Sequence, residues 1–324
     1  MSIVNVAFAQ DAEQLHETAK NYMRQGDYTN AALTLEKAVQ SDPENVGINK
    51  DLAINYMVLK KNNKALEILL PIIQKGKGDD QTYQLAGNIY NILDQRKEAE
   101  NMYKKGIRKF PGSGALYNEY GEMLLSRQDL NAIKIWEKGI QNDPQFSSNY
   151  FNATRFYTTN ANRLWGVIYG EIFLLLEPGT GRTSEIKNSL LENYKKLLTD
   201  EDLLTNLKGR SPFEKAYLQI IAKEKPSITT ITAESLSMFR TRFILDYNNM
   251  YSNKYPFSLF DIHTSLLEEG LFDAYNQWIF GTVQNLAAYQ NWINVHSEEY
   301  ASFTNYQKGR VFKFAKGQSY HSEK

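Results

Sequence analysis

The chain has 324 residues, of which 42% are hydrophobic and 23% charged, and its 37 basic residues balance its 37 acidic ones. This composition is typical of a globular protein with one large domain or two ordinary ones, and it excludes a largely disordered chain. Zero net charge removes the usual reason to expect nucleic acid as a partner. The absence of cysteine excludes disulfides, thiolate metal sites and thiol catalysis.

Residues 1–10, MSIVNVAFAQ, contain Ala7-Phe8-Ala9, which has the form of a signal-peptide cleavage site. The basic region and longer apolar stretch of a full signal peptide are missing here. We interpret these residues as the remnant of an export signal with cleavage after Ala9, which predicts a periplasmic or envelope-associated protein. The alternative is the frayed N-terminus of a cytoplasmic protein.

Residues 12–45 predict two helices joined by a turn at Gly26-Asp27 and ended by Asp42-Pro43. Large and small apolar residues recur at helical spacing on both sides of the turn. They are Leu15, Ala19, Tyr22, Ala31, Leu35 and Ala38.

This unit of 34 residues strongly resembles a tetratricopeptide repeat (TPR), and the resemblance extends over about residues 12–178. The terminating prolines support it, because Pro111 follows Pro43 by 68 residues, Pro144 follows Pro111 by 33, and Pro178 follows Pro144 by 34. The resemblance implies an all-α fold, a right-handed α–α superhelix whose first helices line a concave face. The five units, within residues 11–180, are 12–45, 46–79, 80–113, 114–146 and 147–180.

Residues 181–305 predict a C-terminal helical domain packed on the end of this solenoid. Helical spacing marks residues 184–198, 213–223, 233–251, 257–269, 271–280 and 284–300. The pair around Gly270 echoes the turn of the repeat and is interpreted as a degenerate TPR-like hairpin. Residues 306–324 are basic and polar and predict a flexible tail.

Residues 164–178 read LWGVIYGEIFLLLEP, a nearly apolar run interrupted by Glu171. The run is too short to span a bilayer, which takes about 20 apolar residues, so we expect no transmembrane segment. A helix that is apolar all round must be buried all round. We therefore expect the C-terminal helices to dock onto this segment.

The sequence offers no recognisable catalytic or metal-binding motif. The four histidines (His16, His263, His296 and His321) lack metal-ligand spacing, and neighbouring carboxylates do not face each other on a helix. We therefore expect no metal, no cofactor and no enzyme activity. An enzyme with a carboxylate site in the second half is kept as a minor hypothesis.

The resemblance implies that repeat positions 2, 5, 9, 12 and 13 face the concave groove. Polar residues there suit an extended peptide, although a solenoid face exposed to water is polar in any case. The family's carboxylate clamp is incomplete, since Ile54 and Val58 are apolar, so chaperone binding is not predicted. The candidate groove residues are His16, Lys20, Arg24, Lys50, Gln84, Asn88, Asn118, Glu122 and Arg155.

Aromatic residues form 13% of the chain and suggest a second candidate surface. Rings in the second half could stack on a glycan, but large apolar residues at helical spacing are more often core. The residues concerned are Tyr247, Tyr251, Tyr255, Trp278 and Trp292.

These observations favour a non-enzymatic scaffold of the bacterial cell envelope that binds a protein or peptide, with no nucleic acid as partner. The alternative function is a glycan-binding or glycan-processing envelope protein that uses the aromatic residues of the C-terminal domain.

Overall fold

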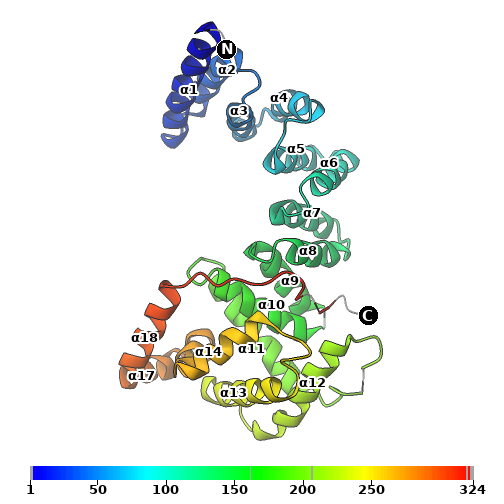
Figure 1. Ribbon diagram of the computed structural model, residues 1–324, viewed down its shortest axis with the longest axis vertical. Coiled ribbons are helices and arrows are strands. Elements are labelled where there is room, and N and C mark those ends of the chain that lie inside the picture. Colours follow the sequence, from blue (N-terminus) through cyan, green and yellow to red (C-terminus); the bar gives the residue numbers. More distant parts are fainter. Residues whose placement is uncertain (1–2, 161, 206, 319, 322–324) are drawn as a thin grey trace. The chain divides into compact units, whose positions relative to one another are not determined.

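The computed structural model describes residues 3–160, 162–205, 207–318 and 320–321, and every regular element among them is a helix (Figure 1). The chain forms two compact units, residues 1–132 and residues 133–324, here called the N-terminal and C-terminal units. The division falls inside the predicted repeats rather than at residue 180. The last repeats therefore belong to the same unit as the C-terminal helices.

The helices of the N-terminal unit follow one another as antiparallel pairs (Figure 1). They are α1 (Ile3–Arg24), α2 (Tyr28–Ser41), α3 (Val46–Val58), α4 (Asn62–Gln74), α5 (Asp80–Ile92), α6 (Arg96–Lys109) and α7 (Gly114–Ser126). Helix α1 runs through the predicted cleavage site at Ala7–Ala9, while Met1 and Ser2 lie outside the described residues.

The C-terminal unit holds the remaining helices. They are α8 (Ala132–Asn142), α9 (Ser147–Thr159), α10 (Arg163–Leu176), α11 (Thr183–Thr199), α12 (Pro212–Glu224), α13 (Ala233–Met250), α14 (Ser258–Glu268), α15 (Phe272–Asn276), α16 (Thr282–Gln284), α17 (Leu286–Val295) and α18 (Ser297–Lys308). A 3₁₀ turn (Lys225–Ser227) follows α12, and a π-helical turn (Gln277–Gly281) follows α15.

The first helix of each pair in the N-terminal unit is followed by a residue in the left-handed backbone conformation. Gly26, Lys60, Asp94 and Gln128 have φ of 78°, 56°, 53° and 61°, and they lie 34 residues apart. The following N–H donates to the carbonyl five residues earlier, which is the Schellman motif. These bonds run from Asp27 to Tyr22, Lys61 to Tyr56, Gln95 to Tyr90 and Asp129 to Leu124.

The prolines that end the repeats take part in a second recurring contact. A side chain six residues after the proline donates to the proline carbonyl, which the chain turn would otherwise leave without a helical donor. The pairs are Asn49 Nδ2 to Pro43 O (3.1 Å), Tyr117 OH to Pro111 O (3.2 Å) and Tyr150 OH to Pro144 O (3.1 Å).

A third recurring contact joins the second helix of one pair to the first helix of the next. A tyrosine hydroxyl donates to a glutamate 20 residues earlier in three places. The pairs are Tyr56 with Glu36 (2.6 Å), Tyr120 with Glu100 (3.0 Å) and Tyr157 with Glu137 (2.6 Å). Each bond is local in sequence, so stacking is specified between neighbouring pairs alone.

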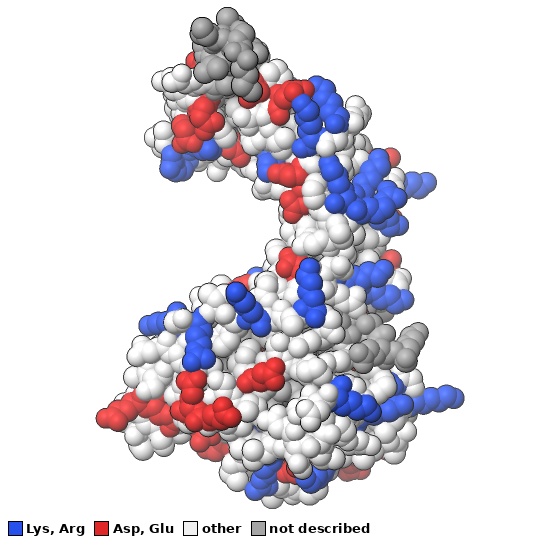
Figure 2. All heavy atoms as spheres, viewed as in Figure 1, with Lys and Arg blue, Asp and Glu red and all other residues white. Residues whose placement is uncertain are grey.

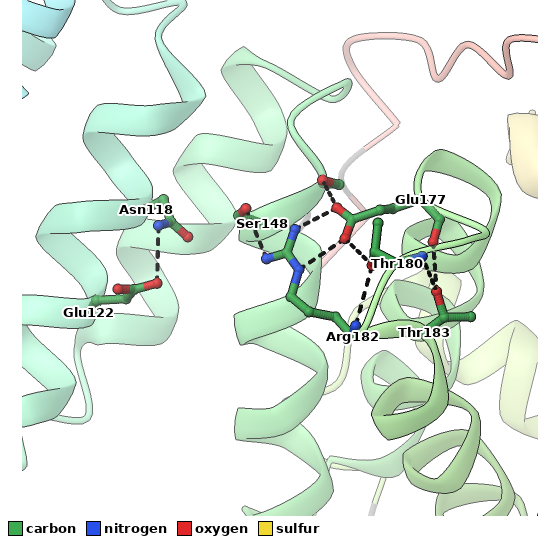
Figure 3. A network of polar contacts seen from close by, with 8 residues as sticks. Asn118, Glu122, Ser148, Glu177, Thr180, Arg182 and Thr183 are labelled. Carbon is green, nitrogen blue, oxygen red and sulfur yellow. Dashed lines mark hydrogen bonds and ion pairs between the residues drawn. The ribbon is translucent and has the colours of Figure 1, made fainter. Parts of the chain in front are cut away.

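Helix α10 is buried along its length from Leu164 to Leu175, as an all-round apolar helix requires. It packs against α9 and α11. The turn into α11 is held by Arg182, whose guanidinium bonds the Glu177 carboxylate and, at 3.1 Å, the hydroxyl of Ser148 (Figure 3). Thr180 also donates to Glu177, at 2.5 Å, so this loop is fixed by its own polar groups.

Glu171 is the charged centre of the C-terminal unit. Its side chain is 2% exposed and pairs with the guanidinium of Arg240 on α13, itself 3% exposed. Tyr194 on α11 donates to the same carboxylate at 2.8 Å, and Nε2 of His263 on α14 lies 2.9 Å from it. Arg240 also donates to Asn276 of α15. Three C-terminal helices therefore converge on the charge that interrupts the apolar run of α10, and a fourth is joined to them through Arg240.

The prediction of a flexible tail after α18 is wrong for the described part of this segment. Phe312, Phe314 and Tyr320 are buried, and the segment runs back from α18 past α9 and α10 (Figure 1). The reason is an alternation of apolar and basic residues in an extended strand-like stretch, which places both phenylalanines on one side. The average composition of residues 306–324 does not reveal this alternation.

The helix expected over residues 284–300 is also corrected. The structure has two helices there, α17 and α18, which meet at His296. The ring of His296 stacks on Trp292 at 4.4 Å, and its Nδ1 lies 3.0 Å from the Trp292 carbonyl oxygen. The backbone N–H of His296 also donates to this carbonyl, at 2.9 Å, so α17 ends with its last helical hydrogen bond in place.

The left-handed turns predict a stabilising substitution. Glutamine in this conformation costs about 1–2 kcal/mol relative to glycine, partly offset by the entropy of glycine. Gln128→Gly is expected to raise the free energy of unfolding by up to about 1 kcal/mol, measured by urea denaturation. Gly26→Ala is the opposite control and is expected to lower it; a destabilising Gln128→Gly would contradict the argument.

The buried ion pair predicts a large loss of stability. Glu171→Gln leaves the Arg240 charge buried without its partner, which costs about 3–5 kcal/mol. The matched control is Glu185→Gln, because Glu185 pairs with Arg155 at 2.8 Å but is half exposed, and its expected cost is below about 1 kcal/mol. Equal losses in thermal melts of the two variants would show that the pair is not special.

Candidate functional site

The predicted groove residues of the N-terminal unit lie on α1, α3, α5 and α7, the first helices of successive pairs. Nε2 of His16 lies 2.7 Å from Asp51, and Gln84 donates to Glu119 at 3.3 Å. Both contacts span 35 residues, one more than the repeat. Lys50 donates to Gln81 at 2.8 Å. These side chains form a polar ladder between neighbouring first helices.

Glu119 is the centre of this ladder, and sequence reasoning missed it. Burial raises the pKa of Glu119, and the nearby Glu122 raises it further, whereas the amides of Gln84, Asn88 and Asn118 lower it. The signal was the 35-residue spacing, which brings position 5 of one repeat to position 6 of the next. Gln84, Asn88, Asn118 and Glu122 are thus brought together around one carboxylate.

The other predicted groove residues are less tightly linked. Lys20 pairs with Glu17 at 2.8 Å, and Arg24 donates to Asn21 at 2.6 Å, both within α1. Asn88 accepts from Tyr103, and Asn118 donates to Glu122 at 3.1 Å (Figure 3). Arg155 belongs to the C-terminal unit.

Exposed apolar side chains stand at the ends of the same first helices. Val58, Ile92 and Leu125 occupy the last turns of α3, α5 and α7 and are exposed. Asn91, beside Ile92, accepts a 2.8 Å hydrogen bond from Arg127, just after Leu125. Contact between the ends of α5 and α7 therefore places an apolar edge beside the polar ladder.

The second helices carry a local basic face despite the zero net charge. Figure 2 shows Lys and Arg side chains gathered over α4 and α6. Six basic residues against two acidic ones lie within α6, and all six are exposed. They are Arg96, Lys97, Lys104, Lys105, Arg108 and Lys109.

The predicted aromatic surface is largely core. Tyr247, Tyr255 and Trp278 are buried, so their ring faces are not accessible for stacking on a glycan. The hydroxyl of Tyr247 donates to the backbone of Tyr255. Tyr251 and Trp292 are half-buried. Tyr247, Tyr255 and Trp278 therefore belong to the hydrophobic core of the C-terminal unit.

The cluster around Glu171 is the strongest candidate for a carboxylate site in the second half. Burial raises the pKa of Glu171, but Arg240, His263 and Tyr194 outweigh burial and hold the pKa at about 2. The adjoining cavity has a volume of about 10 Å³, which is room for one water molecule at most. The cluster therefore acts as a structural centre. Among the described residues, no group of His, Asp and Glu side chains could hold a metal ion.

Within the described ranges, no helix combines the length and apolar character needed to cross a membrane.

Comparison with known proteins matches two stretches of the N-terminal unit to tetratricopeptide repeat family models. The matches cover residues 22–89 and residues 80–108. No curated protein sequence matches the chain.

Three solved structures illustrate what the fold of the chain resembles. A crystal structure of MamA is 23% identical, covers 49% of this chain and 94% of its own, and has a TM-score of 0.41. PilF of Pseudomonas aeruginosa is 14% identical, with 66% and 98% covered and a TM-score of 0.46. YrrB, described as a TPR protein with an unusual peptide-binding site, is 16% identical, with 57% and 98% covered and a TM-score of 0.40.

The buried histidine predicts a pH effect on stability. Burial lowers the pKa of His263 below its ordinary value of 6.5, more than the Glu171 carboxylate raises it. Below about pH 6.5, His263 is therefore protonated in the unfolded chain but still neutral in the folded chain. The free energy of unfolding falls as the pH falls through this range.

His263→Gln removes this contribution. The loss of melting temperature between pH about 7.5 and about 5.5 is expected to be smaller in this variant than in the wild type. The exposed His296→Gln serves as the control and is expected to keep the wild-type loss. An unchanged pH dependence in His263→Gln would refute the assignment.

Proposed function

We propose that the chain is a non-enzymatic scaffold that binds an extended segment of a partner protein along α1, α3, α5 and α7. The match of residues 22–89 and 80–108 to tetratricopeptide repeat models supports this proposal. The observation that carries the proposal is the polar ladder beside the exposed edge of Val58, Ile92 and Leu125. An extended peptide presents both polar backbone groups and alternating side chains. The polar ladder can bond the backbone groups of the peptide, and the apolar edge can contact its side chains.

The amides of the ladder supply the backbone contacts. Gln84, Asn88 and Asn118 each carry both donors and an acceptor, so they can bond the N–H and C=O groups of a peptide. Their present partners are neighbouring side chains of the same ladder, such as Glu119 and Glu122. A peptide that takes over these contacts has to supply donors to the Glu119 carboxylate, because burial penalises that carboxylate when it is unpaired. The N–H groups of an extended backbone can supply them.

The apolar edge supplies specificity. Val58, Ile92 and Leu125 would bury apolar side chains of the peptide, at a gain of about 25 cal/mol per Å² of surface removed from water. The edge recurs once per repeat, which suits a ligand longer than one repeat. We infer a partner segment with apolar side chains on one side and a hydrogen-bonding backbone.

We also propose a location in the bacterial cell envelope. The support for it is the cleavage-type sequence Ala7-Phe8-Ala9. Cell fractionation followed by N-terminal sequencing of the mature protein tests it. A protein that is recovered from the cytoplasm with residues 1–9 intact would contradict this location.

The binding proposal predicts the effect of a charge on the apolar edge. Peptides selected on the full chain from a displayed random library are expected to bind Ile92→Glu at least about tenfold more weakly, a loss of about 1.4 kcal/mol. The control is Leu33→Glu, on a second helix and equally exposed, which is expected to bind like the wild type. Titration by fluorescence anisotropy measures both. Equal affinity for both variants, or a library that yields no binder, would contradict the proposal.

A further inference from the structure

The C-terminal segment, residues 310–318 and 320–321, lies on the C-terminal unit without helical structure. Residues 310–315 have no regular secondary structure, and a turn follows at Lys316-Gly317, where φ of Gly317 is 85°. Along it, exposed and buried side chains alternate: Val311 is 86% exposed, Phe312 8%, and Phe314 6%, with Lys313 exposed between the two rings. Among the described residues, no backbone–backbone hydrogen bond joins residues 310–318 to another element. The segment is therefore held by side chains, as a bound peptide is, and not by a shared ladder.

The surface beneath it is built from elements that are far away in sequence. Phe314 lies among residues of α8 to α10 and of the loop before α14, including Tyr150, Trp165 and Phe257. Its ring is 6.5 Å from that of Tyr150. Further along, the ring of Tyr320 stacks on Phe213 at 4.6 Å. Two aromatic pockets six residues apart thus receive the segment.

Polar groups of the unit fix the segment between and beyond the pockets. Gln145 donates to the backbone carbonyl of Phe314 at 3.0 Å. The backbone N–H and hydroxyl of Ser258 both donate to Gln318, each at 2.8 Å. At the far end the hydroxyl of Tyr320 donates to the carbonyl of Pro256 at 2.6 Å. The segment therefore makes one hydrogen bond through its backbone and the others through its side chains, and it places two aromatic rings in pockets of the unit. Such pockets with hydrogen bonds between them are features of a peptide-binding site.

We propose that the C-terminal unit carries a binding site for peptides with an aromatic residue followed six residues later by tyrosine, and that residues 310–321 occupy it as an intramolecular ligand. A partner segment of the same pattern competes with the tethered one. This site is separate from the ladder of the N-terminal unit.

The test uses a labelled peptide of residues 309–324 and the full chain. In Phe312→Ala/Phe314→Ala/Tyr320→Ala the tethered segment loses its anchors, so the peptide is expected to bind at least about tenfold more tightly than it binds the wild type, whose tethered segment competes at an effective concentration of about a millimolar. The matched control, Val311→Ala/Lys313→Ala/Lys316→Ala, changes exposed positions of the same segment and is expected to bind like the wild type. A peptide with both phenylalanines replaced by alanine is expected to bind neither the wild type nor either variant.

Equal peptide affinity for the anchor variant and the wild type would overturn the proposal, and so would equal binding of the alanine peptide. If the anchor variant loses its cooperative melt, a protease site inserted between Gly309 and Arg310 of the full chain replaces it. After cleavage the unit is expected to stay folded, and excess unlabelled peptide is expected to displace the cut segment. Unfolding on cleavage, or a segment that cannot be displaced, would show that it is core and not ligand. The Ile92→Glu substitution is expected to leave all these results unchanged.

Discussion

The pairing of Glu171 with Arg240 sets the architecture of the C-terminal unit. One carboxylate in an otherwise apolar helix must find a charge and hydrogen-bond donors once it is buried. It finds them on α11, α13 and α14, and Arg240 in turn reaches α15. Apolar residues of similar size would give comparable stability. The charge instead penalises any arrangement in which one of these helices is misplaced.

The N-terminal unit is organised in the opposite way. Among its described residues, the recurring contacts lie within a repeat or between one repeat and the next. The left-handed turn residues, the proline carbonyl bonds and the tyrosine–glutamate bonds all follow from local sequence spacing. Polar groups between the first helices are satisfied by one another through the ladder. The face is thereby polar and ordered before any ligand arrives, which lowers the entropy lost on binding.

Much of this fold can be read from the sequence, because repeat spacing and helical periodicity are local signals. The repeat helices and the full burial of α10 follow from them. The partner of Glu171 does not, because Arg240 is 69 residues away and no spacing rule links the two. The role of Glu119 was not predicted either, because it becomes visible only when consecutive repeats are compared with an offset of one residue.

The remaining misses share a physical cause. Phe312 and Phe314 stand in a segment of basic and polar residues, and only their alternation reveals a buried side. For Tyr247, Tyr255 and Trp278 the sequence favoured core and left a surface as the alternative, because their burial depends on helices that meet only in the folded chain. Composition describes a segment by itself, whereas burial depends on its neighbours.

The tyrosine–glutamate bonds have a mechanical consequence. Each links one helix pair to the next and to nothing beyond it, so a pulling force on the N-terminal unit is carried by these junctions in series. A break at one junction under load therefore leaves the hydrogen bonds inside the neighbouring helix pairs intact.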